Sequence, residues 1–579
     1  EGYIKKILPI NKLVTISGKI SFFKGKYQIT NPTHISEDKN KIKKIHSSYS
    51  LTEGITDNVF NKIINEVLKN LPKMSEWLSP NAMKYLKNVS WNDAINNLHK
   101  PLEKNQNKKY LNRLIFDEIF STFLINSNIR KNFKKQNKEP KKINLNLTKF
   151  VEDKIGFKLT EDQKKAILEI NKDISSNQRM FRLLQGDVGS GKTIVALISA
   201  QNVICNKFQV AFMAPTEILA KQHYNLAKKI FPKNINIDLL TSKTEYKDRK
   251  NILENLNKNK IKVLFGTHSL FQDKIVYKKL GLIVIDEQHK FGVKQRKRLS
   301  DKGGKNCDVL VMSATPIPRT MVMTIFGDMD VSIIKEKPKN RKDIITYSKL
   351  ETKVDEVLSF INKQILNKKQ IFWVCPLIEE SKKVEQKSSI ERYKFLEKKY
   401  KNKVGLVHGS LEKNKRNKVL QDFLNRKIDI LVSTTVIEVG IDFPNANVIV
   451  IENANKFGLS QLHQLRGRVG RGSVESYCIL LFKSNLSENA KKRINILKNT
   501  NDGFKISEED MKLRGYGDLL GFKQSGLQSF RLADPVINED LFILAEKQTK
   551  KLETENVNLD KYHSLLKLYD RADILNDIA

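Results

Sequence analysis

Short apolar runs alternate with stretches of helical periodicity from about residue 150 to residue 451. Each run has the length of a buried strand, and this alternation is typical of a parallel sheet that helices cover on both faces. The runs fall into two groups, so the sequence predicts two α/β domains joined by a hinge at residues 336–341. The runs are Arg182–Leu184, Val210–Met213, Lys262–Phe265, Leu280–Ile285 and Asp308–Met312, then Ile371–Val374, Lys403–Val407, Ile428–Ser433 and Asn447–Ile451.

The regions on either side have other patterns. Residues 13–30 alternate apolar and polar side chains in short pieces with glycines between them, which predicts two or three strands of a small sheet or barrel. Apolar positions recur at helical spacing between residues 51 and 130 and again after residue 491. The basic stretch 130–142 is interpreted as a solvated connector.

The composition narrows the class of partner. Lysine and arginine total 104 against 64 acidic residues, a net charge of +40, which favours nucleic acid before a membrane surface. The alternative is codon bias, because lysine and asparagine are abundant along the whole chain. The four cysteines are far apart, which argues against a disulfide scaffold or zinc cluster and is typical of the reducing cytosol. No apolar run reaches the roughly 18 residues of a membrane span.

One loop matches the phosphate-binding motif G-x-x-x-x-G-K-[ST] in full, between a predicted strand and a predicted helix. Its glycines let backbone N–H groups surround phosphate oxygens, and the positive end of the following helix adds to the attraction. We expect Lys192 to reach the β- and γ-phosphates and Thr193 to bind Mg²⁺. The motif consists of Gly186, Asp187, Val188, Gly189, Ser190, Gly191, Lys192 and Thr193.

Two carboxylates, Asp286 and Glu287, follow the apolar run Leu280–Ile285. The carboxyl ends of parallel strands are where such sheets bind ligands. We therefore expect Asp286 to hold Mg²⁺ and Glu287 to deprotonate the attacking water of a nucleoside triphosphatase.

Three arginines, Arg466, Arg468 and Arg471, lie close together near the end of the second α/β domain. A basic surface turn is the alternative interpretation. Phosphoryl transfer needs cations at the γ-phosphate, however, so we predict that Arg468 and Arg471 reach the nucleotide when the two domains close on each other. Hydrolysis would then be tied to domain motion, as in a motor.

The ordered set of motifs resembles that of superfamily 2 helicases, and specifically the RecG family of branched-DNA helicases. The likeness runs from about residue 150 to the end of the chain, with weaker similarity before it. Tyr516, Lys290 and Lys523 depart from the proline and the two arginines that are usual in the family. The motifs are Leu159–Gln163, Ala214–His223, Gly266–His268, Asp286–His289, Phe291–Arg296, Ser313–Arg319, His408–Gly409, Ser433–Asp442, Gln464–Arg471 and Asp502–Asp534.

The resemblance implies roles for further residues. Gln163 would recognise adenine, and hence ATP, while Arg493, Arg514 and Gln524 would form the hydrogen-bond relay of a translocation hairpin. Phe23 and Tyr27 would stack on unpaired bases, at ~1–3 kcal/mol per base, unless they belong to the core of their sheet. The implied DNA-backbone contacts are Thr216, Thr267 and Thr435, and the implied coupling residues are Gln288, His289, Ser313, Thr315, Gln464, Arg493, Arg514 and Gln524.

The resemblance also implies an α/β architecture with two tandem RecA-like parallel-sheet motor domains. The expected parts are a partial OB-fold wedge (1–45), a helical linker (46–150), motor domain 1 with the ATP site (151–340), motor domain 2 (341–490), and a translocation hairpin with C-terminal helices (491–579). The family's earlier barrel strands are not found in residues 1–45, so either the sequence is cut at its front or the wedge is degraded.

The implied activity is that of an ATP-dependent DNA helicase that uses Mg²⁺, reverses stalled forks and migrates Holliday junctions in recombination and repair. We expect a monomer in the bacterial cytosol, with branched duplex DNA as its partner, single-strand-binding protein as a candidate partner and no membrane association. The alternatives are a transcription-repair coupling translocase, a primosomal PriA-type helicase, an RNA helicase and an inactive junction-binding clamp. The first would need a larger N-terminal region, and the second would need clustered zinc cysteines.

Overall fold

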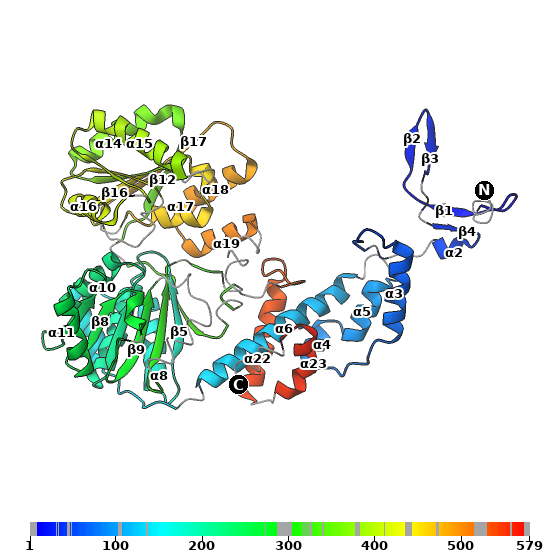
Figure 1. Ribbon diagram of the computed structural model, residues 1–579, viewed down its shortest axis with the longest axis horizontal. Coiled ribbons are helices and arrows are strands. Elements are labelled where there is room, and N and C mark those ends of the chain that lie inside the picture. The colour runs from blue at the N-terminus through cyan, green and yellow to red at the C-terminus, as the bar shows by residue number, and fades with distance from the viewer. Residues whose placement is uncertain are drawn as a thin grey trace. The chain divides into compact units, whose positions relative to one another are not determined.

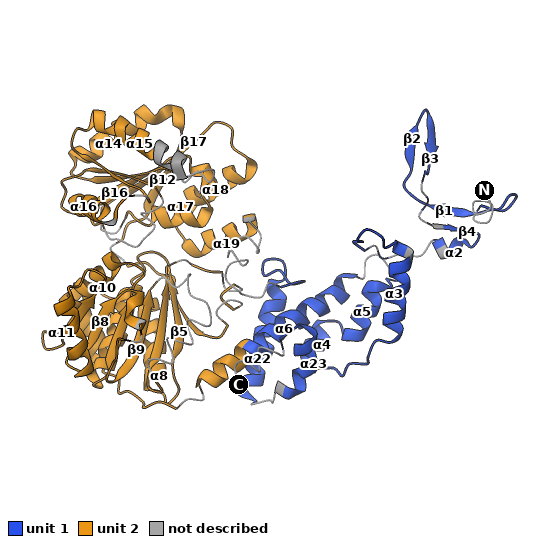
Figure 2. Cartoon of the chain, viewed as in Figure 1, with its two compact units in different colours: residues 1–125, 530–579 blue, residues 126–529 orange. Residues whose placement is uncertain are grey.

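The computed structural model (Figure 1) describes residues 8–30, 32, 34–42, 47, 49–101, 107–134, 137–272, 274–286, 304–314, 316–318, 321–323, 327–338, 341–376, 382–409, 411–434, 443–470, 474–514, 530–555 and 559–571. The chain has two compact units (Figure 2). The smaller consists of residues 1–125 and 530–579, and the larger consists of residues 126–529.

The first α/β domain of the larger unit is built on a sheet whose strands are β5 (Phe181–Gly186), β6 (Gln209–Met213), β7 (Ile237–Leu240), β8 (Val263–Gly266), β9 (Leu280–Asp286), β10 (Asp308–Ser313) and β11 (Asp330–Ile334). Among the described residues these seven strands run parallel in the order β11-β5-β10-β9-β6-β8-β7. Its helices include α7 (Asn146–Ile155), α8 (Glu161–Ser175), α9 (Lys192–Cys205), α10 (Glu217–Ile230), α11 (Tyr246–Asn257) and the 3-10 turn η1 (His268–Phe271).

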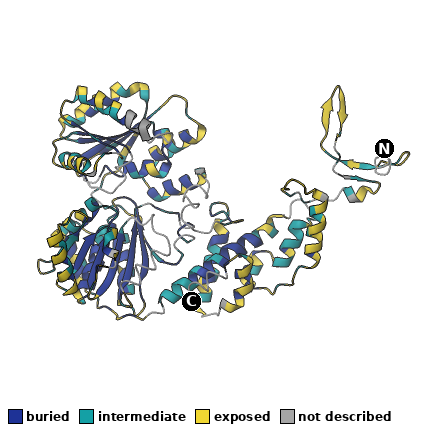
Figure 3. Ribbon diagram, viewed as in Figure 1, coloured by how far each residue is buried: buried dark blue, intermediate teal, exposed yellow. Residues whose placement is uncertain are grey.

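Helices cover both faces of this sheet, and Figure 3 shows its strands as buried. Successive residues of a strand point to opposite faces. In β5, Leu184 packs into one hydrophobic core with Ile170 of α8 and Ala196 of α9, whereas Leu183 packs into a second core on the other face. This arrangement explains why the strands read as continuous apolar runs in the sequence.

The second α/β domain repeats the plan. Its strands are β12 (Ile344–Leu350), β13 (Gln370–Val374), β14 (Val404–Val407), β15 (Ile430–Ser433), β16 (Ala446–Ile451) and β17 (Ser476–Phe482). In the part of the chain that the structure describes, these six strands run parallel in the order β12-β17-β16-β13-β15-β14. The prediction of two parallel-sheet α/β domains is confirmed. The helices include α14 (Val354–Leu366), α15 (Lys382–Lys399), α16 (Lys413–Leu424), α17 (Leu459–Arg466), α18 (Glu488–Asn499) and α19 (Gly503–Arg514).

Two lysines of the basic stretch 130–142 are buried against the first sheet. Lys138 and Lys141 place their Nζ atoms 2.6 and 2.8 Å from the two carboxylate oxygens of Asp308, at the start of β10. Burial lowers the pKa of Lys138, although the charge of Asp308 opposes that shift. The interpretation of this stretch as a solvated connector is therefore wrong for these two residues, which form with Asp308 what we call the base cluster.

The smaller unit joins the beginning of the chain to its end. Its helices include α2 (Lys39–Ile42), α3 (Asp57–Lys69), α4 (Pro80–Tyr85), α5 (Trp91–His99), most of α6 (Asn107–Lys134), α22 (Glu539–Thr554), the 3-10 turn η5 (Leu559–Tyr562) and α23 (His563–Leu568). The carboxylate of Glu118 in α6 accepts hydrogen bonds from the backbone N–H groups of Arg531 (2.6 Å), Leu532 (2.9 Å) and Ala533 (2.9 Å). This carboxylate fixes the point at which the chain returns to the unit.

Four short strands precede these helices in the described residues: β1 (Thr15–Ser17) pairs with β4 (His34–Ser36), and β2 (Ser21–Phe23) pairs with β3 (Lys26–Gln28), both antiparallel. The predicted strands within residues 13–30 are thus confirmed. Phe23 and Tyr27 are 58% and 81% exposed, so neither is a core residue. The Tyr27 ring lies beside that of Phe22 on the paired strand, with centroids 5.0 Å apart.

Candidate nucleotide site

The loop between β5 and α9 has the backbone of a phosphate-binding loop. Gly189 and Gly191 have φ angles of 77° and 85°, in the left-handed region where glycine is favoured. A Cβ atom on Gly186 would lie 2.5 Å from Oγ of Ser190. Gly191 is the N-cap of α9 and makes no side-chain cap hydrogen bond, so the positive end of this helix is suited to an anion.

Lys192, the first residue of α9, lies inside the curve of the loop. Its ammonium donates to the carbonyl oxygens of Gly186 (2.8 Å) and Asp187 (2.9 Å), and the residue is buried. A positive charge is therefore held beside the N–H groups that the loop presents, which is the combination that a polyphosphate requires.

Gln163 connects the start of α8 to this loop. Its side chain completes a capping box, because Oε1 accepts from the N–H of Thr160 (2.9 Å) while the N–H of Gln163 donates to Oγ1 of Thr160 (3.3 Å). Its Nε2 donates to the carbonyl of Ser190 (2.7 Å). The predicted adenine-recognition residue is thus buried, rigid and in contact with the phosphate-binding loop.

Asp286 ends strand β9 at the same edge of the sheet as the loop. It is aligned with Met312 of β10, the strand that separates β9 from β5. Oδ2 of Asp286 lies 2.8 Å from Nε2 of His223, which projects from α10. The Asp286 carboxylate and the Thr193 hydroxyl are hard oxygen donors of the kind that Mg²⁺ prefers, so the residues present fit this ion.

The second α/β domain reaches the loop through the end of α17. Nε2 of His463 lies 2.8 Å from Oδ1 of Asp187, and a Cβ atom on Gly467 would lie 2.9 Å from Cβ of Val188. In turn, Arg466 places Nη2 2.9 Å from Nδ1 of His463. We call these contacts between the loop and α17 the seam. They bring the arginine-bearing segment of one domain to the phosphate-binding loop of the other.

A further arginine strengthens the seam. Arg341, in the segment between β11 and β12, donates from Nη1 to the carbonyl of Val188 and from Nε to the carbonyl of Gly470, both at 2.6 Å. One guanidinium therefore joins the loop to the residues that follow α17. A planar fork with several N–H donors suits this double contact.

The Asp187 carboxyl at the seam is almost fully buried. Burial raises its pKa, but the hydrogen bond and charge of His463, together with the charge of Lys337 and the Val188 N–H, lower it to about 2. Asp187 is thus a carboxylate at neutral pH.

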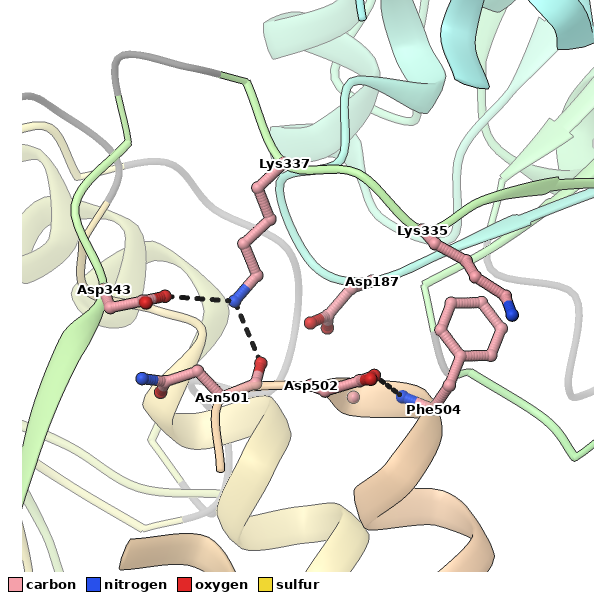
Figure 4. Close-up of a pocket in the computed structure, with 8 residues that line it drawn as sticks. Asp187, Lys335, Lys337, Asp343, Asn501, Asp502 and Phe504 are labelled. Atoms are coloured by element: carbon pink, nitrogen blue, oxygen red, sulfur yellow. Dashed lines mark hydrogen bonds and ion pairs between the residues drawn. The ribbon is translucent and has the colours of Figure 1, made fainter. Parts of the chain in front are cut away.

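A cavity of about 380 Å³ borders the seam (Figure 4). Its walls come from the loop, from the segment between β11 and β12, and from the start of α19. Lys337 crosses it: Nζ donates to the carbonyl of Asn501 (2.9 Å) and lies 3.8 Å from the carboxylate of Asp343. The lining residues are Asp187, Lys335, Lys337, Asp343, Asn501, Asp502, Gly503 and Phe504.

Several other predicted residues have defined places. Arg468 is buried just beyond α17, and Ser313 is buried at the end of β10. Arg493 of α18 donates to the carbonyls of Phe457 (2.8 Å) and Asn455 (3.2 Å). Gln464 lies on α17 with intermediate exposure.

The predicted DNA contacts are spread over the chain. Thr216 caps α10 through its hydroxyl, which accepts from the N–H of Leu219 at 3.4 Å, and Thr267 precedes η1. Phe23 and Tyr27 belong to the smaller unit and are not part of the seam. The remaining predictions lie outside the described residues: Glu287, Gln288, His289, Thr315, Thr435, Arg471, Gln524 and the side chain of Arg514.

No individual role was predicted for His223, His463, Arg341 or Gly503, although His223 and Gly503 lie within motifs that carry the resemblance. His463 directly precedes the predicted Gln464, so the motif itself offered a signal. Arg341 stands in a hinge rich in lysine, where a single arginine carries no distinguishing pattern. The partners of His223 and Arg341 are distant in the chain, and no local pattern identifies such pairs.

Comparisons with known proteins match both α/β domains to helicase families. Within the chain, the model of the DEAD/DEAH box helicase family matches residues 160–324, and the model of the helicase conserved C-terminal domain matches residues 348–473. A third model, described as ATP-dependent DNA helicase RecG, domain 3, C-terminal, matches residues 500–563. These matches cover the loop, the seam and the segment that contains α19.

Curated relatives and a solved structure extend the similarity over nearly the whole chain. The ATP-dependent DNA helicase RecG of Thermotoga maritima is 41% identical over 572 residues, which are 98% of this chain and 73% of that protein. That of Bacillus subtilis is 41% identical over 543 residues, 92% of this chain and 78% of that protein. A solved structure described as RecG bound to a three-way DNA junction has a TM-score of 0.68 and 38% identity, and it covers 95% of this chain and 73% of that one.

In the part of the chain that the structure describes, none of the helices has the length and apolar character needed to cross a bilayer.

Proposed function

The chain belongs to the RecG family of ATP-dependent DNA helicases, and from this premise we propose that it hydrolyses ATP at the seam and uses the energy to remodel branched duplex DNA. Its substrates would be stalled replication forks and Holliday junctions, in recombination and repair. The observation that carries the proposal is the contact of the phosphate-binding loop with α17, through Asp187 and His463.

The roles at the nucleotide follow from this arrangement. Lys192 and the N–H groups of the loop bind the phosphates, Gln163 recognises adenine, and Thr193 and Asp286 hold Mg²⁺. When bound, this ion offsets negative charge on the phosphate oxygens. Glu287 deprotonates the attacking water. This division of labour is supported by the buried Lys192 and by the position of Asp286 at the edge of the sheet.

Arginines from the second domain complete the site. Arg468 and Arg471 stabilise charge on the transferred phosphoryl group when the domains close. The burial of Arg468 just beyond α17, next to a segment in contact with the loop, supports this role. Closure thereby makes hydrolysis depend on the relative position of the two domains.

The DNA-bound part of the cycle uses residues outside the seam. Thr216, Thr267 and Thr435 contact the phosphate backbone, and Gln288, His289, Ser313, Thr315 and Gln464 couple these contacts to the nucleotide. Arg493, Arg514 and Gln524 relay the motion to the hairpin, and Phe23 and Tyr27 stack on separated bases, for which their exposure is suitable. We place the protein in the bacterial cytosol as a monomer, with single-strand-binding protein as a candidate partner.

Parallel measurements of ATP turnover test this function. The wild-type protein is given a three-way junction, a linear duplex, a single strand or RNA, each at low and at physiological salt. We expect the junction to stimulate turnover most and its strands to separate, with a steep loss at higher salt because most contacts are to phosphates.

The other results have distinct meanings. Equal stimulation by RNA would indicate an RNA helicase, and stimulation by linear duplex without strand separation would indicate a translocase of the transcription-repair coupling type. Tight junction binding with no turnover would indicate an inactive clamp. Any of these three results contradicts the proposal.

A further inference from the structure

The first residue of α19, Gly503, lies beside both Asp187 and His463, the two residues that join the loop and α17 at the seam. A Cβ atom added to Gly503 would lie 2.7 Å from Nε2 of His463, 2.8 Å from Cγ of Asp187 and 2.8 Å from Cγ of Pro316. All three distances are well inside van der Waals contact. The position has no room for a side chain, and glycine is needed there because of this close approach.

Two contacts fix the backbone on either side of Gly503 (Figure 4). Oδ1 of Asp502 accepts from the N–H of Phe504 at 2.9 Å, which caps the helix. Nζ of Lys337 donates to the carbonyl of Asn501 at 2.9 Å. The first turn of α19 therefore cannot shift independently of its surroundings.

The rest of α19 is held by the second α/β domain. Oδ2 of Asp510 accepts from the N–H (3.1 Å) and the hydroxyl (2.6 Å) of Ser460 in α17. Leu513 packs against the hydrophobic core of that domain. At Gly503 the helix also comes within contact distance of Asp187 in the first domain.

We propose that Gly503 and His463 are positioning residues that tie α19 to the nucleotide-binding loop, so that movement of Asp187 during the ATP cycle displaces α19. Groups packed without a gap transmit small shifts, because neither partner can absorb them. Residues 515–529, which follow α19, belong to the segment that resembles the translocation motif. The inference rests on the proposed function, because it takes the loop at Asp187 to be the ATP site.

Gly503→Ala tests this role, with Glu508→Ala, an exposed position on the same helix, as the matched control. The added methyl group would overlap His463, Asp187 and Pro316, so α19 and these neighbours must move apart. We expect stimulation by a three-way junction and strand separation to fall at least about fivefold, a larger factor than any change in ATP turnover without DNA. The control variant should retain wild-type stimulation.

A double-mutant cycle separates positioning from simple packing. His463→Ala removes both the partner of Asp187 and the atom that lies nearest the added methyl group. It should lower stimulation by itself, and Gly503→Ala should then cause little further loss. If Gly503→Ala does not fold, His463→Ala alone decides, with His463→Asn expected to restore part of the stimulation because it keeps an N–H donor.

Unchanged stimulation in the Gly503 and His463 variants would overturn the inference, and so would fully additive losses. These outcomes differ from failure of the proposed function, in which the wild-type protein itself would show no stimulation by DNA.

Discussion

The base cluster and the seam each centre on one buried aspartate of the first α/β domain, yet the two aspartates are held differently. Asp308 lies between the ammonium groups of Lys138 and Lys141 and also accepts from the N–H of Met180 (2.8 Å), so these three partners all pack against the first sheet. Asp187 contacts His463 of the other domain and borders the cavity.

The difference concerns which contacts can be exchanged. Separating one partner from a closed, buried cluster would leave an uncompensated charge in the interior. Because this costs several kcal/mol, we expect the cluster to stay intact as long as the domain is folded. At the seam, the same type of group can lose its partner when the domains separate, because adjoining space admits water and Lys337 is near. We therefore expect changes in the base cluster to affect stability and changes at the seam to affect turnover.

The largest effect should come from the base cluster. Asp308→Ala leaves two buried ammonium groups without a counter-charge and should lower the free energy of unfolding by about 3–5 kcal/mol. Urea denaturation followed by tryptophan fluorescence and circular dichroism measures the loss. The control is Glu139→Ala, which removes an exposed ion pair with Lys279 and should cost less than about 1 kcal/mol. Equal losses in the two variants would show that the base cluster contributes no more to stability than an exposed ion pair.

Lys192→Ala should produce the next largest effect, at the nucleotide. Loss of the cation that faces the phosphates should reduce ATP turnover on a three-way junction by about 100-fold or more. Junction binding should persist, because the DNA contacts are elsewhere, and the thermal midpoint should change little. If turnover survives, the loop is not the site of hydrolysis.

Thermal unfolding midpoints of the wild-type protein and of Asp187→Asn, measured over a range of acidic pH, test how the Asp187 carboxylate contributes to stability. The folded-state pKa of Asp187, about 2, is below the ordinary value near 3.9, so its contribution to stability is present above pH 4 and is lost as the pH falls toward 2. The midpoint difference between the proteins should therefore shrink as the pH falls from about 4 toward 2. A difference that stays constant through this interval would show that Asp187 is not held as a carboxylate at the seam.

Arg341→Lys should give the smallest effect. Lysine keeps the charge but cannot reach the carbonyls of Val188 and Gly470 with a planar fork, so turnover should fall about tenfold, as expected for roughly one lost charged hydrogen bond. The unfolding free energy should be unchanged within experimental error. If the variant instead loses stability with unchanged turnover, Arg341 contributes to folding, as the base cluster does, and not to hydrolysis.

Much of the fold could be predicted because central strands are buried on both faces. β5, β6 and β8 are buried along their whole length. In the sequence, β8 is an uninterrupted apolar run and β6 is one after Gln209, whereas Arg182 and Gln185 flank the two leucines of β5. The strands β7, β11 and β12 were missed, and each lies at the edge of its sheet, where one side is partly exposed. β17 was missed although it is central and largely apolar, so its pattern was available.

The site was predictable where chemistry fixes a local pattern. Gly189 and Gly191 both have positive φ angles, which favour glycine, and both glycines are visible in the sequence. Contacts that join distant residues give no such signal: Asp187 and His463 are 276 positions apart, and Lys138 and Asp308 are 170 positions apart. A lysine of the base cluster looks in the sequence like any solvent-exposed lysine.

Because the chain returns to the smaller unit at Glu118, this unit can be completed only late in synthesis. Arg531, whose N–H this carboxylate accepts, leaves the ribosome 413 residues later, a delay on the order of tens of seconds at ~5–20 residues per second. During that interval the aromatic face of α6, where Phe120 and Phe123 later receive Tyr562 and Phe542, has no cover from the end of the chain. The larger unit can therefore be complete while the smaller one still lacks its last helices.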